Sequence, residues 1–185
     1  MDIKKGISIF DDDVELIIAV GGGSSIDVGK SINILKAQEG KPVHYVTNKQ
    51  EIQNRGCPMV AIPTTAGSGS EATQFAVIYL NGVKYSLTHE YILPKYTIID
   101  PMLTQSMPRY ITASSGMDAF SQAIESFWSI NSTSSSREYA EKAISLANNN
   151  LKKAVEIGSL QYREKMAQAA NLAGKSINIS KTTAP

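Results

Sequence analysis

A short apolar run that ends in three consecutive glycines constrains the fold of this chain more than any other stretch. The run Leu16 to Val20 is β-branched at its centre and has no alternating polar residues, and Gly21 to Gly23 follow it directly. Such a run is typical of a strand buried on both faces, as in a parallel sheet. Residues without a Cβ let the backbone turn sharply and bring an anion against its N–H groups. Ser24 and Ser25 are favoured N-caps, so a helix is predicted to begin near Ile26 with its N-terminus aimed at a phosphate.

Two common phosphate-binding motifs do not fit this stretch. The dinucleotide pattern G-x-G-x-x-G requires a third glycine where the chain has Ile26. The P-loop pattern G-x-x-x-x-G-K-[ST] requires its first glycine at the position of Ser24, and Asp27 would place a carboxylate among the phosphates. The stretch therefore predicts phosphate binding without matching either motif.

A second segment rich in glycine and hydroxyl groups follows another predicted strand. Met59 to Ile62 indicates a strand, and the segment from Pro63 to Glu71 contains two glycines and four hydroxyl side chains. In a doubly wound sheet, ligands bind at the carboxyl ends of the strands. The residues alone leave two interpretations open, a second phosphate-contacting loop or an ordinary turn.

The order of the predicted elements indicates an α/β fold, with a partial doubly wound parallel sheet followed by an all-helical domain. Before Asp100 we expect helices at 1–10 and 26–37, strands at 16–20, 43–46, 59–62, 75–80, 83–87 and 97–99, and a hairpin turn at Asn81-Gly82. From Thr112 onward, predicted helices follow one another without strands. We therefore expect an α/β dinucleotide-binding domain at 1–108 and a helical domain at 109–185.

Three helices are expected in the second domain. The first has an apolar face that consists of Met117, Phe120, Ile124, Phe127 and Trp128. Ser135 and Glu138 have the spacing of a capping box for the second helix. Ser159 is expected to cap the third, which runs towards Ser180 and packs through the small residues Ala169, Ala170 and Ala173, together with Met166.

The composition favours a small-molecule partner. The chain has 18 basic and 17 acidic residues, a net charge of +1 and no dense basic run, so neither nucleic acid nor an anionic membrane is expected as a partner. No apolar run approaches the length of a membrane span. Cys57 is the only cysteine, which excludes an internal disulfide and fits a reducing compartment. We therefore expect a cytoplasmic protein.

Both loops resemble the signatures of one enzyme family. Residues 21–30 are similar to the Gly-Gly-Gly-Ser-x-x-Asp-x-Ala-Lys signature of the iron-containing (group III) alcohol dehydrogenases, with Gly29 in the alanine position. Residues 63–71 are similar to the Pro-Thr-Thr-Ala-Gly-Thr-Gly-Ser-Glu signature of the same family, with Ser68 in place of the threonine. The likeness extends through Asp100-Pro101 and Pro108.

In that family the two loops hold the phosphates and ribose of a dinucleotide, and a lysine further along reaches the nicotinamide ribose. The resemblance implies that NAD or NADP is bound by Gly21, Gly22, Gly23, Ser24, Asp27, Thr64, Thr65, Ser68 and Lys84. The choice between NAD and NADP is not encoded in these residues, because the residue facing the adenosine 2′ position normally follows an earlier strand.

Asp118 and Gln122 lie four residues apart and therefore leave the same face of a helix. The family usually has Asp-Ala-x-x-His here, which supplies two of the ligands to a divalent iron or zinc. The resemblance implies that both residues bind the metal, with the carbonyl oxygen of Gln122 in place of an imidazole nitrogen. The alternative is that Gln122 hydrogen-bonds Asp118 or a substrate group. Glutamine at this position is similar to members that reduce phosphonoacetaldehyde-like substrates.

The other family ligands are histidines, and no histidine follows His89 in this chain. We therefore expect a segment of a longer enzyme, without about the first two strands of the nucleotide domain and without most of the second half of the helical domain. The segment alone is expected to lack a closed metal site and activity of its own. The expected activity is hydride transfer between the nicotinamide and a carbonyl carbon of an alcohol or aldehyde substrate, in a homodimer or larger homo-oligomer. Two alternatives stay open: a relative of dehydroquinate synthase or sugar-phosphate dehydrogenases, and a nucleotide-binding or oligomerisation module without turnover.

Overall fold

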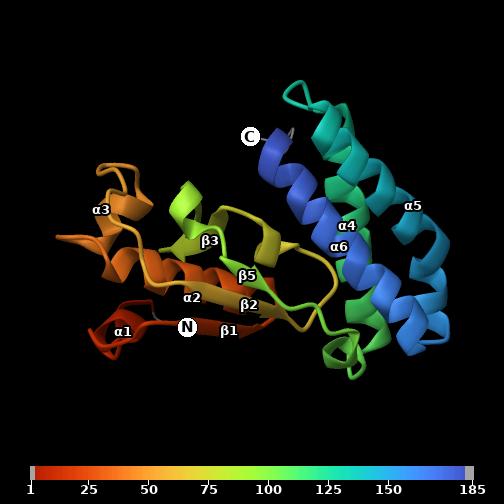
Figure 1. Cartoon of the computed structure of the whole chain (residues 1–185), viewed down its shortest axis with the longest axis horizontal. Helices are drawn as coiled ribbons and strands as arrows, with labels where there is room; N and C mark the ends of the chain where they lie inside the picture. Colours follow the sequence, from red (N-terminus) through yellow and green to blue (C-terminus); the bar gives the residue numbers. More distant parts are fainter. Residues whose placement is uncertain (1–2, 182–185) are drawn as a thin grey trace.

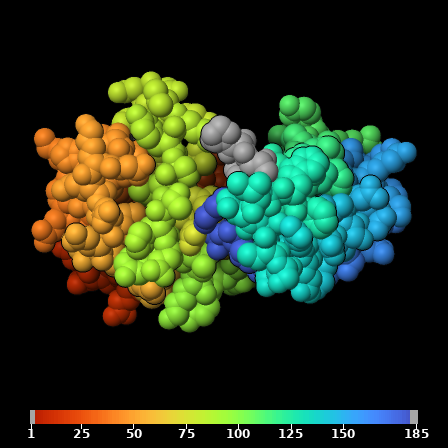
Figure 2. Space-filling view, turned by 90° about the horizontal axis from the view of Figure 1, so that it is seen from above, coloured from red at the N-terminus to blue at the C-terminus, as the bar shows by residue number. Residues whose placement is uncertain are grey.

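The structure, a computed structural model, describes residues 3–181. An α/β part and a helical part lie side by side along the long axis (Figures 1 and 2). The α/β part contains α1 (Ile3–Ser8), β1 (Ile17–Gly21), α2 (Gly23–Lys36), α3 (Pro42–Val46), β2 (Met59–Pro63), η1 (Ser70–Ala72), β3 (Phe75–Leu80), β4 (Val83–Thr88), η2 (Glu90–Ile92) and β5 (Tyr96–Thr97). The helical part follows η3 (Pro101–Thr104) and contains α4 (Arg109–Trp128), α5 (Ser134–Glu156) and α6 (Leu160–Ser180). The expectations for residues 1–2 and 182–185 lie outside the described residues.

The parallel sheet places both glycine-rich loops at one edge. Its strand order is β1-β2-β5, and Gly21 at the end of β1 lies opposite Pro63 at the end of β2. β3 and β4 form a separate antiparallel hairpin. Asn81 and Gly82 connect its strands with φ of 51° and 79°, the conformation that two-residue hairpin turns require. The predicted α/β fold with its parallel sheet is therefore confirmed.

The expectation that β1 is buried on both faces is wrong. Ala19 faces inward and packs in the same core cluster as Ile26 of α2. Ile18 and Val20 point the other way and are 59% and 54% exposed. Side chains alternate between the two faces of a strand, and α2 covers the face that carries Ala19, since a Cβ on Gly29 of α2 would lie 3.1 Å from the Cβ of Ala19. Figure 1 shows this helix along one side of the sheet.

Two other local predictions in the α/β part are wrong. Segment 43–46 belongs to helix α3 and is not a strand, because Pro42 has the fixed φ that suits the first helical position. Helix α2 begins at Gly23 with Gly22 as its N-cap, so both serines lie in its first turn.

The helical part is held together by small residues. Ala119 and Ala123 of α4 pack in one core cluster with alanines of α5 and with the predicted stripe of α6, which is confirmed. The predicted large apolar face of α4 is only partly buried: Phe120 packs against this cluster, whereas Met117 and Trp128 are 49% and 66% exposed. Small side chains let three helix axes approach closely, and that packing selects the alanine face of α4.

Helix α5 starts at a capping box other than the predicted one. The side chains and backbone of Thr133 and Ser136 cap each other, and the pair Ser135 and Glu138 does not form the box. Ser159 is the N-cap of α6, without a side-chain hydrogen bond to the helix. Residues 132–136, before and at the start of α5, are all serine or threonine, so the sequence pattern predicted helix α5 but not which residue caps it.

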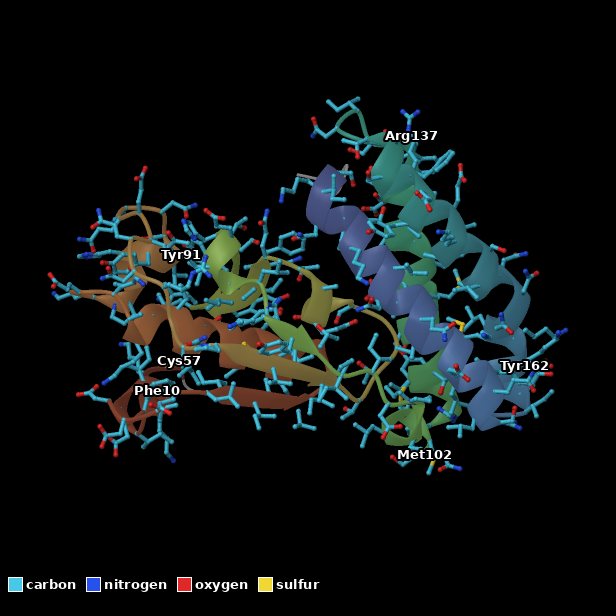
Figure 3. The ribbon with its side chains drawn as sticks, in the orientation of Figure 1. Phe10, Cys57, Tyr91, Met102, Arg137 and Tyr162 are labelled. Carbon is cyan, nitrogen blue, oxygen red and sulfur yellow. The ribbon has the colours of Figure 1, made fainter. Side chains whose placement is uncertain are left out.

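A buried arginine fixes the connection between the two parts. Figure 3 shows Met102, in η3, at the lower edge of the view, where the chain enters the helical part. Arg163 of α6 donates hydrogen bonds to the carbonyl oxygens of Thr104, Met107 and Gly158.

In residues 3–181, none of the helices combines the length and the apolar character that crossing a bilayer demands.

Candidate functional site

The two glycine-rich loops meet at the carboxyl ends of β1 and β2. The backbone N–H of Thr64 donates a hydrogen bond of 2.9 Å to the carbonyl oxygen of Gly21. A Cβ built on Gly22 would lie 3.4 Å from Cγ2 of Thr65. The structure therefore brings the two motifs together at one edge of the sheet.

The three glycines of the first loop differ in what excludes a side chain. Gly21 has a φ of 153°, and a Cβ there would lie 2.6 Å from the Cβ of Ser25. A Cβ on Gly23 would collide with the hydroxyl of Ser68. Gly22 has φ of −71° and ψ of 177°, which any residue adopts, and its neighbours leave ordinary contact distances. The packing of the chain thus requires glycine at positions 21 and 23. It does not require glycine at position 22, where the absent side chain leaves an open space beside the loop.

Helix α2 begins beside that space without a side-chain cap. Gly22 is its N-cap and makes no side-chain hydrogen bond to the first turn. Ser24 is exposed in that turn. The uncapped N–H groups and the positive end of the helix dipole make such a terminus suited to an anion.

Asp27 holds the second loop and the hairpin against α2. One carboxylate oxygen accepts a hydrogen bond of 2.5 Å from the hydroxyl of Ser70, and the other accepts one of 3.0 Å from the backbone N–H of Val77. Both oxygens are thus engaged by the protein. The geometry gives Asp27 a structural part in the site, a role that the sequence pattern did not reveal.

Lys30 is buried against the segment that leads from the second loop into β3, and it was not among the predicted site residues. Its side chain is 1% exposed, and Nζ donates to the carbonyl oxygen of Thr73 at 2.8 Å, to the hydroxyl of Thr73 at 3.1 Å and to the carbonyl oxygen of Phe75 at 3.0 Å. Burial lowers the pKa of Lys30 to about 8, although the carboxylates of Asp27 and Glu71 oppose that shift. Lys30 lies four residues after the buried Ile26 on the same face of α2, and this spacing is the sequence feature from which its burial could have been predicted.

Lys84 lies on the hairpin and is exposed. It is paired with Tyr79 across β3 and β4, two residues along each strand from the pair Val77 and Ser86. Alternate residues of a strand share one face, so Lys84 lies on the same face as Val77, whose N–H is bound by Asp27. In residues 3–181, Lys84 makes no hydrogen bond or ion pair with either glycine-rich loop, so the structure does not join it to them directly.

Asp118 and Gln122 occupy the part of α4 that follows its contact with the second loop. A Cβ on Gly67 would lie 2.8 Å from the carbonyl oxygen of Ser115, one helical turn before Asp118. Asp118 is exposed, whereas Oε1 of Gln122 is buried and has no hydrogen-bond partner among the described residues. A buried carbonyl oxygen without a donor is a favourable position for a cation.

The donor set around α4 is a pair of oxygens. Within residues 3–181, no three His, Cys, Asp or Glu side chains come together in a way that could hold a metal ion. The exposed carboxylate of Asp118 and the unpartnered carbonyl oxygen of Gln122 are oxygen donors of a kind that divalent metals accept. His89 is not part of it, because its Nδ1 accepts a hydrogen bond from the backbone N–H of Tyr91.

These features define an α/β dinucleotide-binding fold with an appended helical region that contacts the second loop. Residues 1–101 match the family described as iron-containing alcohol dehydrogenase. Residues 112–184 match the C-terminal region of the Fe-containing alcohol dehydrogenase family. The chain belongs to the iron-containing alcohol dehydrogenase family.

Similar proteins have several named substrates. Long-chain-alcohol dehydrogenase 1 of Geobacillus thermodenitrificans is 40% identical over 163 residues, which cover 86% of this chain and 41% of the relative. The 1,3-propanediol dehydrogenase of Klebsiella pneumoniae is 37% identical over 181 residues, which cover 96% of this chain and 46% of the relative. The structure of sulfoacetaldehyde reductase from Bifidobacterium kashiwanohense in complex with NAD+ has a TM-score of 0.93 and 35% identity, and the match covers 98% of this chain and 49% of that one. The chain thus spans less than half the length of these relatives.

Proposed function

We propose that this chain forms the dinucleotide-binding and metal-contributing part of an NAD(P)-linked alcohol dehydrogenase or aldehyde reductase. The observation that carries the proposal is the contact between Gly22 and Thr65, which brings two loops together at the N-terminus of α2. The NAD+ complex of the similar sulfoacetaldehyde reductase supports the identity of the ligand. On this proposal, residues 1–108 and 109–185 form the two domains.

The diphosphate is bound by backbone N–H groups of the first loop and by the start of α2. The hydroxyl side chains around it are those of Ser24, Thr64, Thr65 and Ser68. Gly22 leaves space for the phosphates, while Gly21, Gly23 and Asp27 maintain the shape of the loops. Lys84 provides a positive charge on the hairpin for the ribose end of the cofactor.

Asp118 and Gln122 would hold a divalent metal, iron in the first place and zinc as the alternative. When bound, the nicotinamide carries the hydride and the metal withdraws electron density from the substrate oxygen. Asp118 contributes the negative charge of the pair, and Gln122 contributes a neutral oxygen. A carbonyl oxygen is a weaker ligand than imidazole towards iron or zinc, so we expect lower metal affinity than an Asp and His pair gives.

The proposed substrate is a small aldehyde or the corresponding alcohol. The name of the similar sulfoacetaldehyde reductase supports an aldehyde that carries an acidic group, which agrees with a phosphonoacetaldehyde-like substrate. The names of the other relatives support neutral alcohols as the alternative within the same reaction class.

Dinucleotide binding and turnover, measured separately, test this function. The chain is mixed with NADH or NADPH, with iron(II) or zinc, and binding is followed by cofactor fluorescence and oxidation by absorbance after an aldehyde is added. We expect saturable binding, and any oxidation should depend on both metal and aldehyde. An Asp118→Asn variant should bind the dinucleotide normally and lose the metal-dependent oxidation. Binding without oxidation would favour a nucleotide-binding module without turnover, and absence of binding would contradict the proposal.

A further inference from the structure

One face of α6 contacts the segment that leads from the second loop into β3. The residues of this face are Asn171, Gly174 and Asn178, here called the α6 stripe. They are spaced three and four residues apart, so they lie on one side of the helix. Their partners lie in segment 69–74. Figures 1 and 2 both show α6 as the helix of the helical part that lies against the α/β part.

At one end of the α6 stripe, an amide binds a buried carboxylate. Nδ2 of Asn171 donates a hydrogen bond of 3.1 Å to Oε1 of Glu71. The two residues are only 6% and 4% exposed. Because the amide acts as a donor here, an acid in its place would bring two carboxylates together in a buried position.

At the centre, two backbones touch. Gly69 has a φ of 60°, and a Cβ there would lie 2.6 Å from the Cα of Gly174. A Cβ on Gly174 would in turn lie 2.9 Å from the Cα of Gly69. This crossing fixes how closely the second loop approaches α6.

At the other end, the α6 stripe acts as an acceptor. The backbone N–H of Gln74 donates a hydrogen bond of 2.8 Å to Oδ1 of Asn178. An aspartate at this position would keep the accepting oxygen, whereas an alanine would remove it. Asn171 and Asn178 therefore differ in chemical requirement although they are the same residue type on the same helix face.

The opposite side of segment 69–74 is held by α2. The hydroxyl of Ser70 donates to Asp27, and the carbonyl oxygen and hydroxyl of Thr73 accept hydrogen bonds from Lys30. Segment 69–74 thus lies between two helices, directly after the hydroxyl residues of the second loop. The backbone N–H of Ser70 in this segment donates a hydrogen bond of 3.4 Å to the hydroxyl of Ser68, so the segment is joined directly to the second loop.

We infer that Asn171 and Asn178 are positioning residues for dinucleotide binding. They act on the cofactor through segment 69–74, by keeping the second loop opposite Gly22. This inference rests on the proposed function, and it adds that the helical part sets the affinity of a site located in the α/β part.

The same substitution at both positions tests the inference. In Asn171→Asp, repulsion by Glu71 displaces segment 69–74, and we expect the Kd for NADH to rise about tenfold. In Asn178→Asp, the acceptor is retained, and the Kd should stay within about twofold. Asn178→Ala removes the acceptor and should raise the Kd about fivefold. Asn148→Asp, at an exposed position of α5, is the control for added charge and should leave the Kd unchanged.

The measurement is cofactor fluorescence at a temperature well below the unfolding of every variant, with circular dichroism to confirm the fold. A folded Asn171→Asp with the Kd of the unaltered chain would overturn the inference. If Asn171→Asp does not fold, Asn178→Ala and Asn178→Asp decide it, and equal Kd values for these two would overturn it. An unaltered chain that does not bind NADH would contradict the proposed function and this inference together, whereas an unaltered chain that binds, with variants that bind equally, would contradict the inference alone.

Discussion

Gly22 and Thr65 belong to different loops and lie so close that a Cβ on Gly22 would be 3.4 Å from Cγ2 of Thr65. The parallel pairing of β1 and β2 is the cause, because it sets Gly21 opposite Pro63 and lets both loops leave the same edge of the sheet. The contacts of Asp27, Lys30 and the α6 stripe then hold the second loop in this position. Each of these contacts can be tested separately.

Replacement of Asp27 by asparagine should destabilise the chain by about 1–2 kcal/mol. The carboxylate accepts from both Ser70 and Val77, and an amide has only one accepting oxygen, so one of the two donors loses its partner. The free energy of unfolding in urea measures the effect. Asp13→Asn, in an exposed loop, is the control and should change it by less than about 0.5 kcal/mol. Equal free energies of unfolding for Asp27→Asn and the unaltered chain would show that these two hydrogen bonds do not contribute to the stability of the fold.

Lys30 should make stability rise with pH above about 8. Its pKa is lowered from 10.5 to about 8 by burial, so between these values the unfolded state binds more protons than the folded state. Stability increases with pH wherever the unfolded state binds more protons, here by about 2 kcal/mol from pH 7.5 to pH 9.5. Lys30→Met should lack this increment, whatever its stability at neutral pH. Parallel pH profiles of the two proteins in urea would contradict the assignment.

Substitution of Gln122 by methionine should stabilise the chain by about 1 kcal/mol when metal is removed with EDTA. The buried Oε1 of Gln122 has no partner among the described residues, and methionine removes that polar atom at similar volume. Gln161→Met, at an exposed position of α6, is the control and should have little effect. Thermal unfolding measures both variants. A loss of stability in Gln122→Met would mean that this oxygen already has a hydrogen-bond partner in solution and is not available as a ligand for a cation.

The site was predictable to the extent that local residue types determine it. Consecutive glycines after an apolar run indicated one phosphate loop, while the hydroxyl residues after another run left a second phosphate loop and an ordinary turn open. A parallel sheet brings two such segments together. The role of Asp27 was not predictable, because its partners Ser70 and Val77 are 43 and 50 residues away along the chain. Asn171 gave no signal either, since only the packing of α6 against the second loop reveals what it binds.

The fold, like the site, was predictable where local residue types determine it and was not predictable where packing between distant segments does. The hairpin was predictable because Asn81-Gly82 favours one turn geometry. Segment 43–46 was misassigned as a strand, since its valines outweighed the helix-starting position of Pro42 in a purely local interpretation. The buried face of α4 was misassigned in part. Large apolar residues predict burial in an isolated helix, but only Phe120 among the exposed and half-buried residues Met117, Phe120 and Trp128 packs against the core, because the alanine face permits the close packing of three helices.

The most direct test of the account is calorimetric titration of NADH into the unaltered chain and into Gly22→Ala. The backbone at Gly22 has φ of −71°, and its neighbours leave room for a Cβ, so the variant should keep or slightly raise the free energy of unfolding. The added methyl group occupies the space assigned to the diphosphate, so the Kd for NADH should rise about tenfold. Equal affinity of the two proteins for NADH, or no saturable binding by the unaltered chain, would contradict the claim that these loops bind a dinucleotide.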